Sequence, residues 1–279
     1  MIYKKIKDII ISPTEKTIIF QDINDDWFFM NADGSSKTSL IKFIPQEVSK
    51  IVFDNRNKNI FYFLNEQGVY SADLSLETKK LILTGNIIDF TLQKNDIIYI
   101  ENTKESSLLS RIDIRKPNQI INLSTLPISQ KYIFYESPDE IVNFVDATHD
   151  IFYLFDFDLK IFDDKKMIIP DVKEITWHNN GRSFLFSNNN EIWVYRKEEN
   201  KYSKKLITRL STPIEKAMWF NADTHVIYFN DDKIYIKETI SDNPFLIEYS
   251  NNTKTKQAFL WEDKIMTVSE TGVETFLIQ

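Results

Sequence analysis

The sequence predicts an all-β protein, a seven-bladed β-propeller of four-stranded antiparallel blades. Three observations point to this fold. Short apolar segments rich in Ile, Phe, Tyr and Val alternate with polar turns along the whole chain, as β-strands do. A three-strand phrase recurs about every 40 residues, which is the length of a propeller blade. The strand periodicity leaves no room for a long amphipathic helix.

The repeat is clearest in residues 174–195 (EITWHNNGRSFLFSNNNEIWVY) and 216–236 (KAMWFNADTHVIYFNDDKIYI). In each, an anchor residue near the end of a first strand is followed seven positions later, across a polar turn, by an apolar residue of a second strand. The same offset joins Ile11 with Ile18, Phe53 with Ile60, Phe90 with Ile97, Phe134 with Ile141, Trp177 with Phe184, Trp219 with Val226, and Phe259 with Met266. Successive anchors lie 37 to 44 residues apart, so the chain holds seven repeats.

Each repeat gives its strands in a fixed order. The first strands are expected at residues 7–11, 49–53, 87–90, 131–134, 174–177, 216–219 and 256–259. The second are expected at 17–22, 59–65, 96–102, 140–146, 183–188, 225–230 and 264–269. The third are expected at 26–31, 68–73, 108–114, 150–155, 191–196, 233–238 and 272–278. The fourth are expected at 39–44, 79–85, 118–124, 165–170, 204–211 and 244–250.

These strands divide a single domain, residues 1–279, into blades near residues 7–45, 46–85, 86–128, 129–171, 172–213, 214–252 and 253–279. A lone blade cannot bury both of its faces, whereas stacked neighbours can. The last blade has only three strands of its own. We therefore expect the N-terminal strand, Ile2–Ile6, to supply its outermost strand and close the ring, which removes an open sheet edge. A terminal blade of three strands is the alternative.

Composition excludes several classes of function. The net charge is −7, which disfavours a nucleic-acid groove. No apolar run approaches the length of a membrane span, so no membrane insertion is expected. The absence of Cys rules out disulfides and thiolate chemistry. The chain has only 5 Gly, and no glycine-rich phosphate-binding loop is present. We expect a monomer without a cofactor. The lysine pairs Lys79-Lys80 and Lys204-Lys205 are interpreted as solvated strand edges.

The three histidines, His149, His178 and His225, occupy different positions in the repeat. A metal site needs ligands that converge on one point, and nothing in the register brings these together. No Gly-X-Ser-X-Gly elbow for a nucleophilic serine is present either. We therefore expect no catalytic residue and no metal ligand among them, but ordinary turn and surface side chains.

Carboxylate pairs are more frequent: Asp25-Asp26, Asp156 with Asp158, Asp163-Asp164, and Asp231-Asp232. Paired acids can hold Ca²⁺ or act as acid and base on a glycoside. Each pair lies at a predicted turn, where solvated acids are common, and that is the favoured interpretation. Trp27, Trp193, Tyr70 and Tyr235 in third strands could bind a sugar or peptide, although packing between blades explains them more simply.

The fifth repeat also resembles a known group of proteins. Residues 175–195 and 204–214 (KKLITRLSTPI) are similar to the TolB-type and WD-repeat-like propellers of bacteria, and Ser12-Pro13 matches the same phrase in the first repeat. Thr14-Glu15 replace the usual Asp-Gly there. The phrases WHNNGR, NEIWVY and LITRLSTPI resemble more narrowly the C-terminal propeller of bacterial PEGA-domain proteins, which carry a membrane anchor and a PEGA module. The resemblance implies a propeller of the cell envelope and transfers no site residues.

The favoured function is a non-catalytic binding scaffold. The loops between second and third strands and between blades are acidic and Asn-rich, and loops on a rigid frame commonly carry recognition. We expect Asp25, Asp26, Asn65, Asn190, Asp231 and Asp232 to contact a basic or polar protein or cell-wall component. The alternative is a metal-dependent hydrolase, a lactonase or glycosidase, that works in the central channel. First-strand residues would line that channel, and they contain few acids.

Overall fold

A computed structural model describes residues 6–12, 16–45, 47–135, 137–138, 140–159, 166–178, 180–220, 224–230, 233–240, 246–250, 255–261, 264–269 and 272–277. Every regular element in these residues is a β-strand, so the predicted all-β class is confirmed. Among them, no helix of a length and hydrophobicity suited to crossing a membrane is found.

The described strands form six four-stranded sheets and one three-stranded sheet, all paired antiparallel where the register is defined. The first two sheets contain β1 (Ile6–Ile11), β2 (Thr17–Asp22), β3 (Trp27–Asn31), β4 (Thr38–Ser39), β5 (Lys50–Phe53), β6 (Ile60–Asn65), β7 (Gly68–Asp73) and β8 (Thr78–Thr84). The next two contain β9 (Ile87–Gln93), β10 (Asp96–Asn102), β11 (Ser107–Asp113), β12 (Ile120–Leu126), β13 (Tyr132–Tyr135), β14 (Ile141–Asp146), β15 (Ile151–Asp156) and β16 (Lys166–Ile169).

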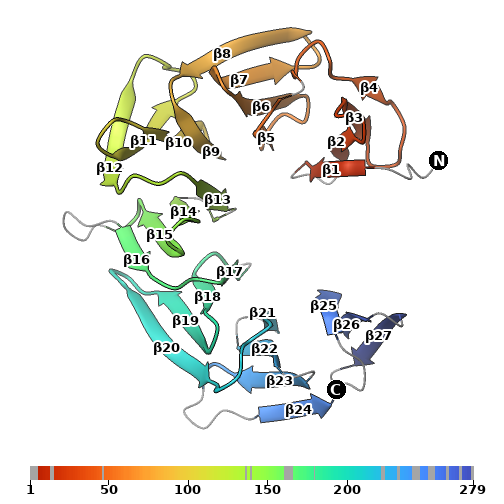
Figure 1. Cartoon of the computed structure of the whole chain (residues 1–279), viewed down its shortest axis with the longest axis vertical. Coiled ribbons are helices and arrows are strands. Elements are labelled where there is room, and N and C mark those ends of the chain that lie inside the picture. The colour runs from red at the N-terminus through yellow and green to blue at the C-terminus, as the bar shows by residue number, and fades with distance from the viewer. Residues whose placement is uncertain are drawn as a thin grey trace. The chain divides into compact units, whose positions relative to one another are not determined.

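The remaining three sheets follow in the same chain order. They contain β17 (Glu174–Trp177), β18 (Ser183–Ser187), β19 (Glu191–Lys197), β20 (Tyr202–Arg209), β21 (Lys216–Phe220), β22 (His225–Asn230), β23 (Lys233–Glu238), β24 (Leu246–Ser250), β25 (Thr255–Trp261), β26 (Lys264–Ser269) and β27 (Gly272–Leu277). In each sheet the strands lie side by side in sequence order, as Figure 1 shows for β5 to β8 and for β17 to β20.

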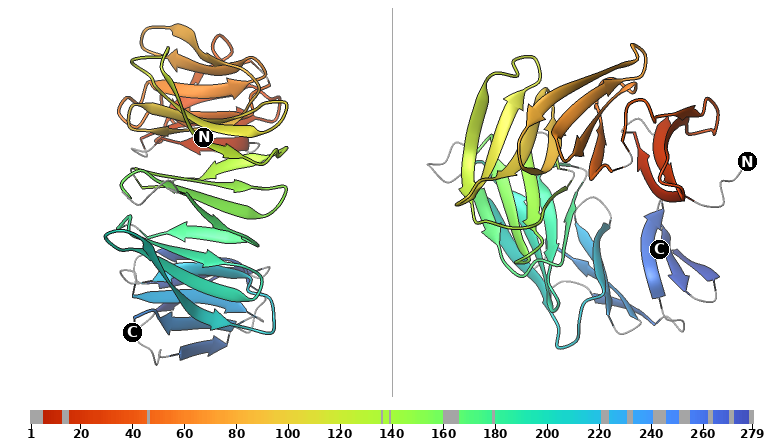
Figure 2. Two further views of the ribbon diagram at one scale, coloured as in Figure 1. Left: turned by 90° about the vertical axis from the view of Figure 1, so that its left-hand side faces the viewer. Right: turned by 45° about the horizontal axis from the view of Figure 1, so that its top comes forward.

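The chain divides into two compact units. The first comprises Met1–Tyr135 and Asp146–Thr148, and the second comprises Glu136–Val145 and His149–Gln279. Each sheet is a set of neighbouring strands that turns connect at both ends, and Figure 2 shows these turns from two further directions.

The anchor pairs test the predicted register. Four of them are directly opposite in the structure: Ile11 and Ile18, Trp177 and Phe184, Trp219 and Val226, Phe259 and Met266. Two others are displaced, since Phe53 lies opposite Phe61 and Phe90 opposite Tyr99. In the third sheet, β9 continues to Gln93, which lies opposite Asp96 across a two-residue turn, so the partner of Phe90 moves further along β10.

One expected strand is wrong. Residues 39–44 (SLIKFI) do not form a full fourth strand, because β4 ends at Ser39. The following residues form a helix-like turn in which the N–H groups of Phe43 and Ile44 both donate to the carbonyl of Leu40, at 2.8 Å. Leu40, Phe43 and Ile44 have the spacing of one helical face and are all buried in the core. The apolar side chains of this segment are therefore buried by a helix-like turn and not by a strand.

Side chains from neighbouring sheets form the cores of each unit. In the first unit, Ile19 and Trp27 pack with Phe61 and Phe63 of the next sheet. In the second unit, Phe184 stacks on Tyr195, with ring centroids 4.8 Å apart, and contacts Phe152 of the preceding sheet. The third-strand aromatics Trp27, Trp193, Tyr70 and Tyr235 all pack against cores that include residues of a neighbouring sheet. Tyr70 also stacks on Phe63, and Tyr235 on Tyr228, within their own sheets.

The predicted ring closure falls mostly outside the described residues. Residues 2–5 of the expected closing strand are not among them, and Ile6 belongs to β1, where it lies opposite Asp22. Among the residues that the structure describes, the last sheet consists of the three strands β25–β27, the number that the final repeat supplies by itself. Closure and the resulting count of seven blades stay predictions.

Candidate functional site

The turns from second to third strands and the connections between sheets share one end of the strands, which we call the loop face. Buried polar side chains at the ends of second strands hold the connections of the loop face in place through hydrogen bonds. In the first unit, the fully buried Asp146 accepts a 2.6 Å hydrogen bond from Ser129 Oγ in the connection to β13. In the second unit, Asn230 Nδ2 donates to the carbonyl of Pro213 at 2.8 Å. Connections tied in this way form a rigid surface.

A pocket of about 640 Å³ opens on the loop face of the second unit. Its walls come from three segments: the turn between β14 and β15, the connection from β16 to β17, and the turn between β18 and β19. The lining residues are Asp150, Asp171, Val172, Lys173, Asn188, Asn189, Asn190 and Glu191. Three carboxylates and one ammonium group therefore line the pocket.

Local hydrogen bonds explain the shape of these walls. Asn188 Oδ1 accepts from the N–H groups of Asn190 and Glu191, an Asx turn that closes the β18–β19 connection. The carbonyl of Asp150 accepts from the N–H of Val172 at 3.0 Å. Asp150 and Asp171 adopt left-handed backbone, with φ of 55° and 56°, which aspartate tolerates better than most residues.

Several polar side chains of the wall are held by neighbours. Glu191 accepts hydrogen bonds from Trp193 Nε1 at 2.8 Å and from Arg209 Nε at 2.6 Å. The hydrogen bond from Trp193, followed by that from Arg209, keeps the pKa of Glu191 below its ordinary value, so this carboxylate stays ionised. Lys173 Nζ donates to the carbonyl of Ile214 at 2.5 Å, and Asn190 Nδ2 donates to that of Leu210 at 3.2 Å.

Asp150 and Asp171 differ from Glu191 because both are exposed to solvent at the mouth of the pocket. They are the carboxylates best placed to meet an incoming group. An ammonium or guanidinium group would form charge-assisted hydrogen bonds with them. The arrangement is suited to holding a cation or a polar hydrogen-bond donor.

The predicted contact residues are divided between the two units. Asn190 lines the pocket. Asp25, Asp26 and Asn65 lie on turns of the first unit, where Asp25 forms an exposed ion pair with Lys7 at 2.5 Å and Asn65 Oδ1 caps its own turn at Gln67. Asp231 and Asp232 lie outside the described residues.

Sequence reasoning missed four of the polar wall residues: Asp150, Asp171, Lys173 and Glu191. A usable signal was the charge in the connection between the fourth and fifth repeats, where Asp171 and Lys173 flank a buried valine. The connections were expected to contribute to the face, but only turn residues were selected as contacts.

The histidines are not brought together. His149 is exposed on the β14–β15 turn next to Asp150, while His178 and His225 lie at the other end of their sheets. His178 Nδ1 accepts from the N–H of Asn180 at 3.1 Å, and the His225 ring bonds the hydroxyl of Thr224. Among the residues that the structure describes, no three His, Cys, Asp or Glu side chains are grouped so as to hold a metal ion.

The interpretation of Asp156 as a solvated turn acid is wrong. Its side chain is completely buried, and it pairs with Lys197 Nζ at 2.9 Å and accepts from the Tyr202 hydroxyl at 2.8 Å. Asp158 is solvated, with a side chain 60% exposed. Asp156 ends the third strand of one sheet, and its partners belong to the next sheet, so it serves as a tie between sheets. Asp163 and Asp164 lie outside the described residues.

A first-strand acid has a similar tie in the first unit. Asp89 is buried, pairs with Lys50 Nζ at 2.8 Å and accepts from the backbone N–H of Phe134 at 2.7 Å. Its contacts join the first strands β5, β9 and β13. This carboxylate is fully occupied by structural partners.

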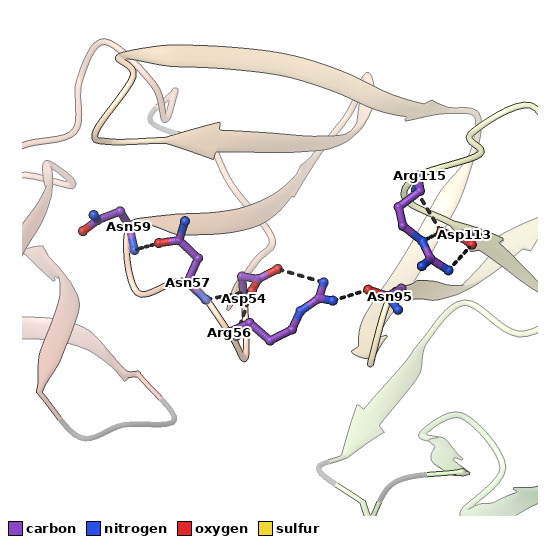
Figure 3. A network of polar contacts seen from close by, with 7 residues as sticks. All are labelled: Asp54, Arg56, Asn57, Asn59, Asn95, Asp113 and Arg115. Atoms are coloured by element: carbon purple, nitrogen blue, oxygen red, sulfur yellow. Dashed lines mark hydrogen bonds and ion pairs between the residues drawn. The ribbon is translucent and has the colours of Figure 1, made fainter.

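The opposite end of the first unit also carries a polar network, drawn in Figure 3. Arg56, on the β5–β6 turn, reaches Asn95 on the β9–β10 turn and lies 3.9 Å from Asp54. Arg115 forms two hydrogen bonds with Asp113, at 2.7 and 2.9 Å, and these lower the pKa of Asp113 to about 2. Since these groups satisfy one another, the pocket on the loop face is the stronger candidate site.

Comparison with known proteins defines the class of fold. No protein-family model matches the chain, and no curated protein matches its sequence. Solved structures do match. Hsv2 of Kluyveromyces lactis superposes with a TM-score of 0.58 at 11% identity, over 99% of this chain and 98% of Hsv2. An oligogalacturonate lyase from Vibrio parahaemolyticus gives 0.55 at 10% identity, over 95% and 86%.

A chain of the mitotic checkpoint complex gives a TM-score of 0.52 at 9% identity, over 100% of this chain and 93% of that one. At such identities the likeness concerns the fold alone. The chain is a β-propeller protein, as the repeat predicted.

Proposed function

We propose that the chain is a non-catalytic binding scaffold whose acidic pocket takes a basic or polar segment of a protein or cell-wall partner. The pocket itself is the observation that carries this proposal. Exposed Asp150 and Asp171 stand at its mouth, over walls that are fixed by hydrogen bonds to main-chain carbonyls. A preorganised wall reduces the entropy lost on binding. The resemblance to TolB-type and PEGA-associated propellers supports a partner in the cell envelope.

The first prediction is that tetralysine, the simplest basic segment, binds the chain and that the Asp150→Asn/Asp171→Asn double variant binds it about tenfold more weakly, a loss of about 1.4 kcal/mol. Asparagine tolerates left-handed backbone as aspartate does, so the turns are retained. Binding is measured by calorimetry at low and high salt, and added salt is expected to weaken it.

The matched control is Glu198→Gln/Glu199→Gln, which removes the same charge from the β19–β20 turn at the other end of the sheet. Its affinity should stay near that of the unsubstituted chain. Equal losses in both double variants would reduce the effect to net charge and overturn the assignment of the pocket. Tetraglutamate should not bind.

The alternative function, a metal-dependent lactonase or glycosidase, makes a different prediction. It requires turnover of a lactone or glycoside that is stimulated by a divalent cation. Such hydrolysis by the unsubstituted chain would contradict the scaffold proposal. If it survived in Asp150→Asn/Asp171→Asn, the chemistry would lie outside the pocket.

A further inference from the structure

The outermost strands of the sheets differ in the number of charged side chains that they carry. An edge strand exposes N–H and C=O groups that can pair with another chain, and lysines on it prevent this. Three of the fourth-strand segments expected from the repeat contain a lysine pair: Lys79-Lys80, Lys165-Lys166 and Lys204-Lys205. Lys79 and Lys80 are exposed on β8, as is Lys204 on β20. When such an edge meets its own copy, like charges are brought together.

The third sheet has no such protection. Its outermost strand, β12, lies within residues 118–130, which contain no charged residue. Ile120 and Ile121 are 55% and 47% exposed. In Figure 1, β12 is the yellow-green strand at the edge of its sheet in the first unit. An uncharged edge strand with exposed β-branched residues is a typical site for adding a further strand.

We propose that β12 pairs antiparallel with β12 of a second copy of this chain and joins the two sheets into one of eight strands. Charge argues for a second copy, because lysine pairs act most directly against self-pairing and this edge lacks them. The register follows from the bulge that shifts pairing between Leu109 and Ser110 and leaves Leu123 as the extra residue. The regular segment before the bulge, residues 120–122, is centred on Ile121.

In this arrangement Ile121 faces Ile121 of the partner copy across a two-fold axis, and Ile120 faces Asn122. Opposed residues in antiparallel strands have Cα atoms about 4.5–5.5 Å apart, so the two isoleucines are in contact. The interface is small, which makes the association weak and dependent on concentration.

The absence of Cys in the chain allows a direct test of the register. Ile121→Cys introduces a single thiol that would lie opposite its copy at a separation that suits a disulfide. Under mild oxidation this variant is expected to form a covalent dimer about tenfold faster than Leu81→Cys. Leu81 is the matched control because it is 40% exposed on β8, an edge that carries Lys79 and Lys80. Equal rates for the two variants would overturn the register.

A second test measures mass without oxidation. The weight-average mass of the unsubstituted chain should rise from 33.0 kDa towards twice that value between about 10 µM and about 1 mM. Ile121→Lys should keep the mass at the monomer value, whereas Leu81→Lys, with the same added charge, should still associate. A mass that stays at 33.0 kDa throughout, or an equal effect of the two lysine variants, would overturn the proposal.

Discussion

Replacing Asp156 with alanine is expected to destabilise the second unit by about 3–5 kcal/mol, because it removes one partner of a buried ion pair and leaves the other charge without its buried partner. The carboxylate of Asp156 is fully buried and pairs with Lys197 Nζ at 2.9 Å. It also accepts hydrogen bonds from the Tyr202 hydroxyl and from the backbone N–H groups of Asp158 and Leu159. Burial, followed by the charge of Asp156, raises the pKa of Tyr202 far above its ordinary value, so the phenol remains a donor. Alanine leaves these donors without their acceptor.

Asp158→Ala is the matched control, since Asp158 contacts the same lysine at 3.3 Å from a largely exposed position. Exposed ion pairs contribute little, so its expected effect is below about 1 kcal/mol. The free energy of unfolding is measured in urea by tryptophan fluorescence, and Trp177, Trp193, Trp219 and Trp261 all belong to the second unit. Similar losses in both variants would show that burial of Asp156 does not control stability.

The strands were predictable because their signals are local. Alternating apolar residues and turn-forming Asn and Asp mark each strand without knowledge of its neighbours, and segments such as 17–22, 68–73 and 225–230 have the expected bounds. Leu40, Phe43 and Ile44 were misassigned because a short apolar run fits a strand and a buried helical turn equally well. Only the hydrogen bonds to the Leu40 carbonyl distinguish the two.

The pocket was harder to predict because its walls come from three separate segments. The sequence shows that Asn188–Asn190 form a turn, but not that Asp150 and Asp171 approach them. Asp156 and Asp158 illustrate the same limit: both are turn acids two residues apart, yet only the fold brings Lys197 and Tyr202 to the first of them. Charge in sequence does not reveal whether a carboxylate is solvated, paired or available to a ligand.

Gly68→Ala is expected to destabilise the first unit by about 3 kcal/mol or more, through a backbone clash added to backbone strain. Gly68 begins β7 directly after the two-residue turn from β6, and it has a φ of +136°, a conformation that residues with a side chain rarely adopt. A Cβ at this position would lie 2.0 Å from the carbonyl oxygen of Leu83 on β8. Since that oxygen belongs to the main chain of the paired strand, no side-chain rotation relieves the contact.

Gly34→Ala separates the clash from the strain. Gly34 also has a left-handed backbone, with a φ of +85°, but nothing lies within 4 Å of its added Cβ. Its expected cost is about 1 kcal/mol, the conformational part alone. Hydrogen exchange of the β7 and β8 amides reads the stability of this sheet directly. Equal protection of these amides from exchange in Gly68→Ala and Gly34→Ala would contradict the prediction. It would mean that β8 can move away from the turn at little cost, and that its pairing with β7 does not hold this edge of the sheet in place.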